Sequence, residues 1–161
     1  MHVLLVRHGE AVDTRSAPTD TDRWLTNAGR QAVTRLGKAL TKLDLRYSCI
    51  YTSPLVRAVQ TAEILAAMQP DFEGPLEVHR ALSSEEGTTA QALAPLAHAQ
   101  EDDFIVMVTH VPKIGVLAGH LSDLDTAPAF RTASAGLVEI EDGRGRFQWM
   151  LDPDSLGLRA R

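Results

Sequence analysis

The chain has 161 residues, of which 44% are hydrophobic and 23% are charged, a composition that is ordinary for a globular protein. Its formal net charge of −5 at pH 7 argues against binding to nucleic acid or to an anionic membrane surface. The single cysteine, Cys49, excludes an internal disulfide, and the opening apolar run is too short for a signal peptide or a membrane span. We therefore expect one domain over residues 1–161, a cytoplasmic location and a monomer.

The first apolar run, Val3–Val6, predicts a buried strand that enters a turn at Gly9. Arg7 and His8 stand at the exit of this strand, which is where open α/β sheets hold their ligands. A histidine at that place can act as a nucleophile, and an adjacent arginine can hold the anionic group that it attacks. The pattern is weak alone, because a chance strand end with a solvated arginine looks the same.

The next segment, residues 13–24, is polar and predicts a loop that lies over the exit of the first strand. Thr26 is placed to cap the helix that follows it. In this helix of about four turns, apolar residues recur at helical spacing as far as Leu43.

A later segment repeats the order of an apolar strand, a polar residue at its exit and a proline at the start of a helix. The strand covers residues 49–52, and Ser53 is the expected N-cap of the helix. Pro54 is the expected first helical residue, and the helix runs to about Met68. Arg57 then lies in its first turn, where helix N–H groups and the helix dipole favour an anion.

A third segment has the same order. A strand over residues 104–109 leads to His110 and to a helix over residues 112–121. Three strand exits therefore present basic side chains: the first carries Arg7 and His8, the second Arg57 and the third His110.

The remaining segments continue the alternation of strands and helices. They are a short strand over 76–79, an acidic loop over 83–87, an Ala-rich helix over 88–99, and a hairpin of strands over 136–140 and 146–151. The alternation predicts an α/β fold, a three-layer sandwich with a mostly parallel, mixed sheet flanked by helices. The tail after Pro153 is expected to be a loosely attached end.

Three motifs occur in order along the chain: Val-Arg-His-Gly-Glu at 6–10, Thr-Ser-Pro-Leu-x-Arg-Ala-x-Gln-Thr at 52–61, and Val-Thr-His-x-Pro at 108–112. Together they resemble the histidine phosphatase superfamily, which has a phosphoglycerate mutase-like fold. Within that superfamily, the short chain, Arg-Trp-Leu-Thr at 23–26 and Gly-Arg-Phe-Gln-Trp at 145–149 resemble the SixA-like phosphohistidine phosphatases. Longer members of the superfamily carry inserted segments, and this chain of 161 residues is too short to contain them.

The resemblance implies a role for each matching residue. His8 would attack phosphorus and carry a transient phosphoryl group, while Arg7, Arg57 and His110 would bind the phosphoryl oxygens. The transition state of phosphoryl transfer spreads its charge over three equatorial oxygens, so positioning and electrostatic stabilisation carry most of the catalysis. Two guanidinium forks suit that task, with His110 as a neutral or a charged donor. Because these groups supply the positive charge, we expect no metal ion and no cofactor.

The general acid is the least defined part of the predicted site. Ester-cleaving members of the family use a Glu or an Asp to protonate the leaving oxygen, and Glu85 or Glu86 stands in the matching loop. The alternative is a solvated acidic loop, which would suit phosphohistidine, because imidazole leaves more easily than an alkoxide. Arg23 is a candidate for contact with phosphate or with a partner protein, and its alternative is a solvated loop arginine.

Three functions remain as hypotheses. The first is a phosphatase that removes phosphate from a histidine on a phosphotransfer protein, because a chain with few insertions leaves its site open to a protein-borne side chain. The second is a phosphatase of small phosphate esters or other phosphorylated metabolites. The third, a non-catalytic phosphate-binding module, is disfavoured because the nucleophile and the three binding residues are all present.

Overall fold

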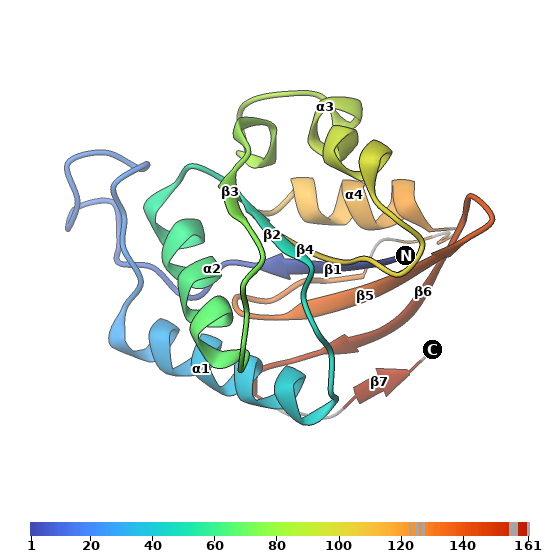
Figure 1. The fold of residues 1–161 in the computed structure, drawn as a ribbon. Coiled ribbons are helices and arrows are strands. Elements are labelled where there is room, and N and C mark those ends of the chain that lie inside the picture. Colours follow the sequence, from blue (N-terminus) through green and yellow to red (C-terminus); the bar gives the residue numbers. More distant parts are fainter. Residues whose placement is uncertain (123, 125, 127, 155–157, 161) are drawn as a thin grey trace.

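The computed structural model describes residues 1–122, 124, 126, 128–154 and 158–160, whose course is drawn in Figure 1. In this part of the chain, seven strands form one mixed sheet in the order β3-β2-β4-β1-β5-β6-β7. The strands are β1 (His2–Arg7), β2 (Cys49–Thr52), β3 (Leu76–Val78), β4 (Phe104–Thr109), β5 (Ala135–Glu141), β6 (Arg144–Leu151) and β7 (Leu158–Ala160). The helices are α1 (Asn27–Lys42), α2 (Val56–Met68), α3 (Thr89–Leu93) and α4 (Lys113–Leu121), with 3₁₀ segments η1 (Arg80–Leu82) and η2 (Ala94–His98). None of the described helices is long and apolar enough to cross a membrane.

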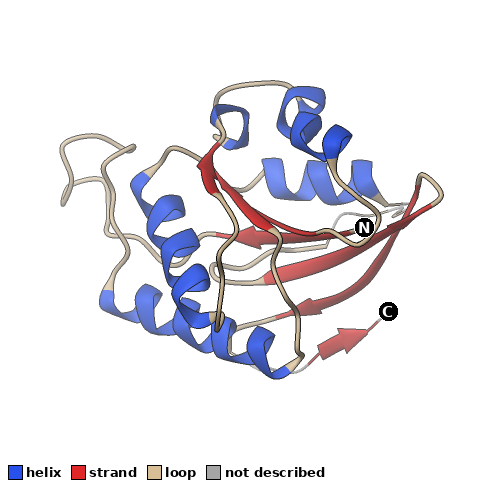
Figure 2. Ribbon diagram, viewed as in Figure 1, coloured by secondary structure: helices blue, strands red, loops and turns tan. Residues whose placement is uncertain are grey.

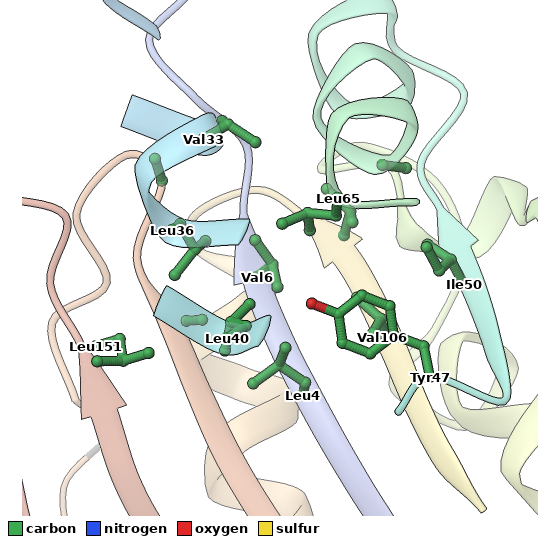
Figure 3. Close-up of a cluster of buried hydrophobic side chains, with 14 of the residues drawn as sticks. Leu4, Val6, Val33, Leu36, Leu40, Tyr47, Ile50, Leu65, Val106 and Leu151 are labelled. Atoms are coloured by element: carbon green, nitrogen blue, oxygen red, sulfur yellow. The ribbon is translucent and has the colours of Figure 1, made fainter. Parts of the chain in front are cut away.

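Helices cover both faces of the sheet (Figure 2). On one face α1 and α2 pack over Leu4 and Val6 of β1, as Figure 3 shows. On the opposite face α3 and α4 pack over Val3 and Leu5. Because successive side chains of a strand point to opposite faces, the apolar run of β1 is buried on both sides. The predicted three-layer α/β sandwich is confirmed.

The register of the parallel strands brings their exits together. β1 is parallel to β4 with Arg7 opposite Thr109, and β2 is parallel to β4 and ends one residue earlier in this register. The three strands therefore end at nearly the same level of the sheet. The segments that leave them begin with His8, Ser53 and His110.

The other half of the sheet is antiparallel and begins with β5, which pairs with β1. β5 and β6 form the predicted hairpin, and its turn holds Asp142 (φ 49°) and Gly143 (φ 73°). Both residues are in the left-handed region that a two-residue hairpin turn of this twist requires. β7 pairs with β6, so residues 158–160 form an edge strand where the sequence predicted a loose end.

The start of α1 packs against the turn that follows β1. Thr26 caps the helix as predicted, since its Oγ1 accepts a hydrogen bond from Gly29 N at 2.9 Å. Thr26 N also donates to Glu10 O at 2.9 Å, and a Cβ on Gly29 would collide with that same carbonyl oxygen. The lack of a side chain at Gly29 therefore allows α1 to hold the turn after His8.

Two other helices differ from the prediction. α2 begins at Val56, two residues after Pro54, and Ser53 does not cap it. The predicted helix over 88–99 is split into α3 and the 3₁₀ segment η2. Pro95 explains the split, because it lacks the N–H group that an α-helical hydrogen bond would need.

Candidate active site

Arg7, His8, Arg57 and His110 lie together at the carboxyl ends of β1, β2 and β4. The ring centroids of His8 and His110 are 4.8 Å apart, and the rings are inclined by 52°. Arg57 Nε donates a hydrogen bond to His8 Nε2 at 3.3 Å. In Figure 1 this is the end to which the β1 arrow points, on the side of the long blue loop. The structure therefore brings three strand exits to one site.

The ring of His8 is held in the tautomer that a nucleophile needs. Its Nδ1 lies 2.7 Å from Gly9 O, and a carbonyl oxygen only accepts hydrogen bonds, so Nδ1 carries the proton. Nε2 then bears the electron pair. Burial is the largest cause that lowers the pKa of His8 from 6.5 to about 4; the hydrogen bond to Gly9 opposes this shift, and the cations Arg57 and Arg7 contribute to it. His8 is therefore neutral at pH 7.

The turn that holds His8 is itself fixed by α2. Gly9 N donates to Thr61 Oγ1 at 3.1 Å, and the Thr61 hydroxyl donates to Arg57 O at 2.7 Å. Thr61 is completely buried, so both hydrogen bonds are shielded from water. This side chain links the turn after β1 to the helix that carries Arg57.

His110 is buried against the exit of β2. Its Nε2 lies 2.7 Å from Ser53 Oγ, and the N-cap position of α2 is taken by Leu55. Burial, together with the nearby charge of Arg57, lowers the pKa of His110 from 6.5 to about 3. His110 is therefore neutral at pH 7 in this structure, which decides between the two protonation states that the sequence left open.

Two buried polar atoms of this site lack a hydrogen-bond partner. Of the buried side-chain nitrogen and oxygen atoms in the described residues, two have no hydrogen-bond partner: Arg7 Nε and His110 Nδ1. Leaving a buried donor or acceptor unpaired costs about 1–3 kcal/mol, and such atoms are rare in folded proteins. His110 packs against the His8 ring and Arg7 precedes His8 in the chain, so two buried polar atoms next to the nucleophile are available to a polar ligand.

Arg57 is 5% exposed, and its guanidinium is bound by the loop of residues 13–24. Its Nη1 donates to Asp20 O at 2.7 Å and its Nη2 to Asp20 Oδ2 at 2.9 Å. The second oxygen of that carboxylate, Oδ1, accepts from Arg23 Nη1 at 2.8 Å, and Arg23 Nε donates to Val12 O at 2.7 Å. The predicted candidate Arg23 thus lies at the rim, joined to Arg57 through Asp20.

Glu85 and Glu86 lie outside the buried cluster. Both residues are exposed, and Glu86 Oε2 is 3.4 Å from Arg80 Nε. They line a pocket of about 430 Å³ together with Asp20. Within the described part of the chain, no hydrogen bond or ion pair joins either glutamate to His8. The structure therefore places the candidate acids next to the residue that holds Arg57 and away from the nucleophile itself.

The loop of these glutamates is attached to the helix that follows His110. Lys113 Nζ donates to Ala81 O at 2.7 Å and to Gly87 O at 3.3 Å, and it also donates to Glu86 O. One ammonium group therefore gathers three carbonyl oxygens from the two ends of the loop.

The positive charge of the site comes from guanidinium groups. Arg7 and Arg57 flank His8, and Arg23 lies at the rim. In residues 1–122, 124, 126, 128–154 and 158–160, no group of three or more His, Cys, Asp and Glu is placed to hold a metal ion. An oxyanion at this site would meet two fixed cations and two neutral imidazoles.

Comparison with known proteins assigns the family. A sequence profile described as the histidine phosphatase superfamily (branch 1) matches residues 3–84. The chain belongs to this superfamily. Membership makes it a phosphatase, and therefore a hydrolase, and confirms the resemblance that the three motifs indicated.

Relatives extend the likeness over nearly the whole chain. An uncharacterized protein of Picosynechococcus sp. is 34% identical over 92% of this chain and 89% of its own. The phosphohistidine phosphatase SixA of Escherichia coli is 25% identical over 98% of both chains. The structure of the protein histidine phosphatase SixA complexed with tungstate has a TM-score of 0.88 at 28% identity, over 98% of this chain and 100% of that one. The phosphoglycerate mutase-like fold is thereby confirmed.

The contacts of three residues of this histidine phosphatase site could not be predicted from the sequence. Thr61 lies in a recognised motif, but nothing in its spacing shows that it bonds to the turn after β1. Ser53 was assigned to the helix cap and instead bonds to His110. Asp20 is one of several acidic residues in a polar loop, and its distance of three residues from Arg23 is the one weak signal of an ion pair.

Proposed function

We propose that this phosphatase removes phosphate from a histidine of a phosphotransfer protein through a covalent intermediate on His8. His8 Nε2 attacks phosphorus, the P–N bond to the substrate imidazole breaks, and that imidazole takes up a proton as it leaves. Water then attacks the phosphorus on His8, which releases inorganic phosphate and restores the neutral ring. Arg7, Arg57 and His110 bind the phosphoryl oxygens in both steps.

One observation carries the proposal: the unpaired buried atoms Arg7 Nε and His110 Nδ1 lie in the side chains around His8. We assign the Ser53 hydroxyl as the donor to His110 Nε2, an assignment that leaves the ring proton of neutral His110 on Nδ1. Both unpaired atoms are then donors, and Arg57 adds its own N–H groups. Donors fixed in a buried site stabilise the three equatorial oxygens of the transition state without reorganising.

The nature of the leaving group favours phosphohistidine. Both glutamates are exposed and Glu86 pairs with Arg80, so neither carboxylate is fixed in place as an acid for a leaving alkoxide. Imidazole leaves with less help from an acid, because its P–N bond is already labile. The likeness to the phosphohistidine phosphatase SixA over 98% of both chains supports the same substrate class.

A second candidate is hydrolysis of small phosphate esters or other phosphorylated metabolites. It is favoured by the pocket of about 430 Å³ that Asp20, Glu85 and Glu86 line beside Arg57. A pocket of this size is large enough for a small leaving group, and its carboxylates are potential acids.

The deciding experiment compares kcat/KM for a phosphohistidine-bearing phosphotransfer domain with kcat/KM for a panel of phosphate esters. We expect the phosphohistidine protein to be the better substrate. Acid-quenching should lose the trapped phosphate, whereas alkaline quenching should preserve it on His8. Higher kcat/KM for an ester would instead support the second candidate.

His8→Ala supplies the control for the chemistry. This variant should retain the circular dichroism spectrum of the wild type and lose turnover and phosphate labelling completely, because His8 supplies the attacking Nε2 and the Nε2 of the neighbouring His110 is bonded to Ser53. Label on another residue, or turnover by the variant, would overturn the covalent mechanism.

A further inference from the structure

Asp20 makes an unusual set of contacts for a half-exposed loop residue. Its side chain is 49% exposed, yet its main-chain oxygen and its carboxylate both bind the nearly buried guanidinium of Arg57. Arginine has five N–H donors in a rigid fork. Asp20 takes one from Nη1 and one from Nη2, and His8 takes the one on Nε. By this count two N–H groups, one on each terminal nitrogen, are left for phosphoryl oxygens.

Asp20 is anchored on two further sides. Its Oδ1 accepts from Arg23, which is in turn attached to Val12 O. The next residue, Thr21, accepts a hydrogen bond at its main-chain oxygen from Val56 N at 3.0 Å. Residues 20–21 are therefore docked on the first turn of α2, which is the turn that carries Arg57. Such a docked segment restricts the rotation of the Arg57 side chain.

We propose that Asp20 is a positioning residue that acts through Arg57. By binding both terminal nitrogens, it fixes the plane of the guanidinium beside His8, so that its remaining N–H groups are held for the phosphoryl oxygens. The Nε–H of Arg57 leaves His8 Nε2 and turns to a phosphoryl oxygen when Nε2 attacks phosphorus. The inference rests on the proposed function only in giving Arg57 that task. Asp20 does not touch the reacting atoms.

Two other roles for Asp20 are less consistent with these contacts. As a proton donor it would have to be protonated, but the hydrogen bond from Arg23 holds the pKa of this carboxyl below its usual range. As a gate that the phosphoryl group displaces, it would have to release the contacts to Arg57 and Arg23 in each turnover. The two roles predict results that differ from those of a positioning residue, so each is an outcome of the test below.

The test uses Asp20→Asn, with Asp22→Asn as the matched control in the same loop. Asp22 Oδ2 accepts a hydrogen bond from Thr19 Oγ1 at 2.6 Å, and no contact to Arg57 is recorded for it among the described residues. Activity is measured on phosphoramidate and on two aryl phosphates whose leaving groups differ in pKa, and vanadate and phosphate serve as inhibitors.

For Asp20→Asn we expect kcat to fall about ten- to a hundredfold, which is the usual effect of a small misplacement in a preorganised site. KM should stay level or fall, because the variant removes a negative charge beside the phosphate site. The inhibition constant of vanadate should rise more than that of phosphate. The loss of kcat should be equal for the two aryl phosphates. In an Arg57→Ala background, Asp20→Asn should cause no further loss, and Asp22→Asn should match the wild type.

The opposite results would overturn the inference. A gate predicts unchanged or higher kcat in Asp20→Asn, and a proton donor predicts a loss that grows with the pKa of the leaving group and persists without Arg57. A direct readout needs no turnover: the ¹⁵N-labelled Arg57 Nε–H should exchange with water faster in Asp20→Asn and not in Asp22→Asn. If the Arg57 Nε–H exchanges at the wild-type rate in Asp20→Asn, only the positioning role is overturned. If the wild-type protein hydrolyses no phosphorylated compound, the proposed function is overturned.

Discussion

The two sides of the active site are built differently. On the phosphoryl side, His8, Arg57 and His110 are at most 9% exposed, and each has its orientation set by hydrogen bonds. On the leaving-group side, Glu85 and Glu86 are exposed on a loop. The contrast teaches that this protein preorganises the site for the phosphoryl group, which is common to all its candidate substrates, and leaves the remainder of the substrate to an open pocket.

The largest effect after loss of the nucleophile is expected on the buried side. Arg57→Ala should lower kcat/KM for a phosphohistidine protein by about 10²- to 10³-fold, by analogy with removal of one oxyanion donor. The control is Arg46→Ala, since the Arg46 side chain is 60% exposed and pairs with Asp44. Steady-state kinetics of both variants test the contrast. A loss below about tenfold for Arg57→Ala would mean that the phosphoryl side is not preorganised.

The buried histidines also make stability depend on pH. The pKa values of His8 and His110 are lowered to about 4 and about 3, so below pH 6.5 the unfolded chain binds protons that the folded chain does not. Stability should therefore fall as the pH drops from neutrality, by about 4 kcal/mol for the pair between pH 7 and pH 5. Urea unfolding across this range measures the slope.

Replacement of one buried and one exposed histidine supplies the control for the pH dependence. His110→Asn should flatten the curve, because one of the two suppressed protonation sites is removed. His98→Asn changes an exposed histidine and should leave the curve unaltered. A wild-type curve that is level down to pH 5 would contradict the neutral state of both buried rings.

A smaller effect is expected on the open side. Glu85→Gln combined with Glu86→Gln should cost less than about tenfold, or 1.4 kcal/mol in the barrier, against a phosphohistidine protein. Against a phosphate ester the cost should be larger if one glutamate acts as the acid, since general acid help is worth about 10²–10⁴-fold. If the double variant loses as much phosphohistidine activity as Arg57→Ala, one glutamate is a general acid. Phosphate esters would then be favoured over phosphohistidine as the substrate class.

No effect is expected from removal of metal ions. Arg7 and Arg57 supply the positive charge beside His8, so exhaustive dialysis against a chelator should leave kcat unchanged. Vanadate, which adopts a five-coordinate geometry, should inhibit the chelated enzyme as well as the untreated one. Activity that is lost on chelation and restored by Mg²⁺ or Zn²⁺ would show that the guanidinium groups are insufficient.

The sequence by itself determined most of the fold. Apolar runs over residues 49–52 and 104–109 coincide with β2 and β4, and Thr26 caps α1 as its residue type and position predicted. These features depend on interactions between residues close in sequence, which is why they were predictable. The α2 start at Val56 was not, because Ser53 lies before the helix and its hydroxyl bonds to His110, which is 57 residues away.

Only the tertiary structure decided how the site works. The motifs brought Arg7, His8, Arg57 and His110 into consideration, since strand exits in an α/β sheet converge. The attachment of the His8–Gly9 turn to Thr61, the neutral state of His110 and the hydrogen bonds of Asp20 to Arg57 depend on burial and on contacts between residues 37 to 57 positions apart. Such contacts have no local pattern, because their free energy exists only after the sheet has assembled and excluded water from the site.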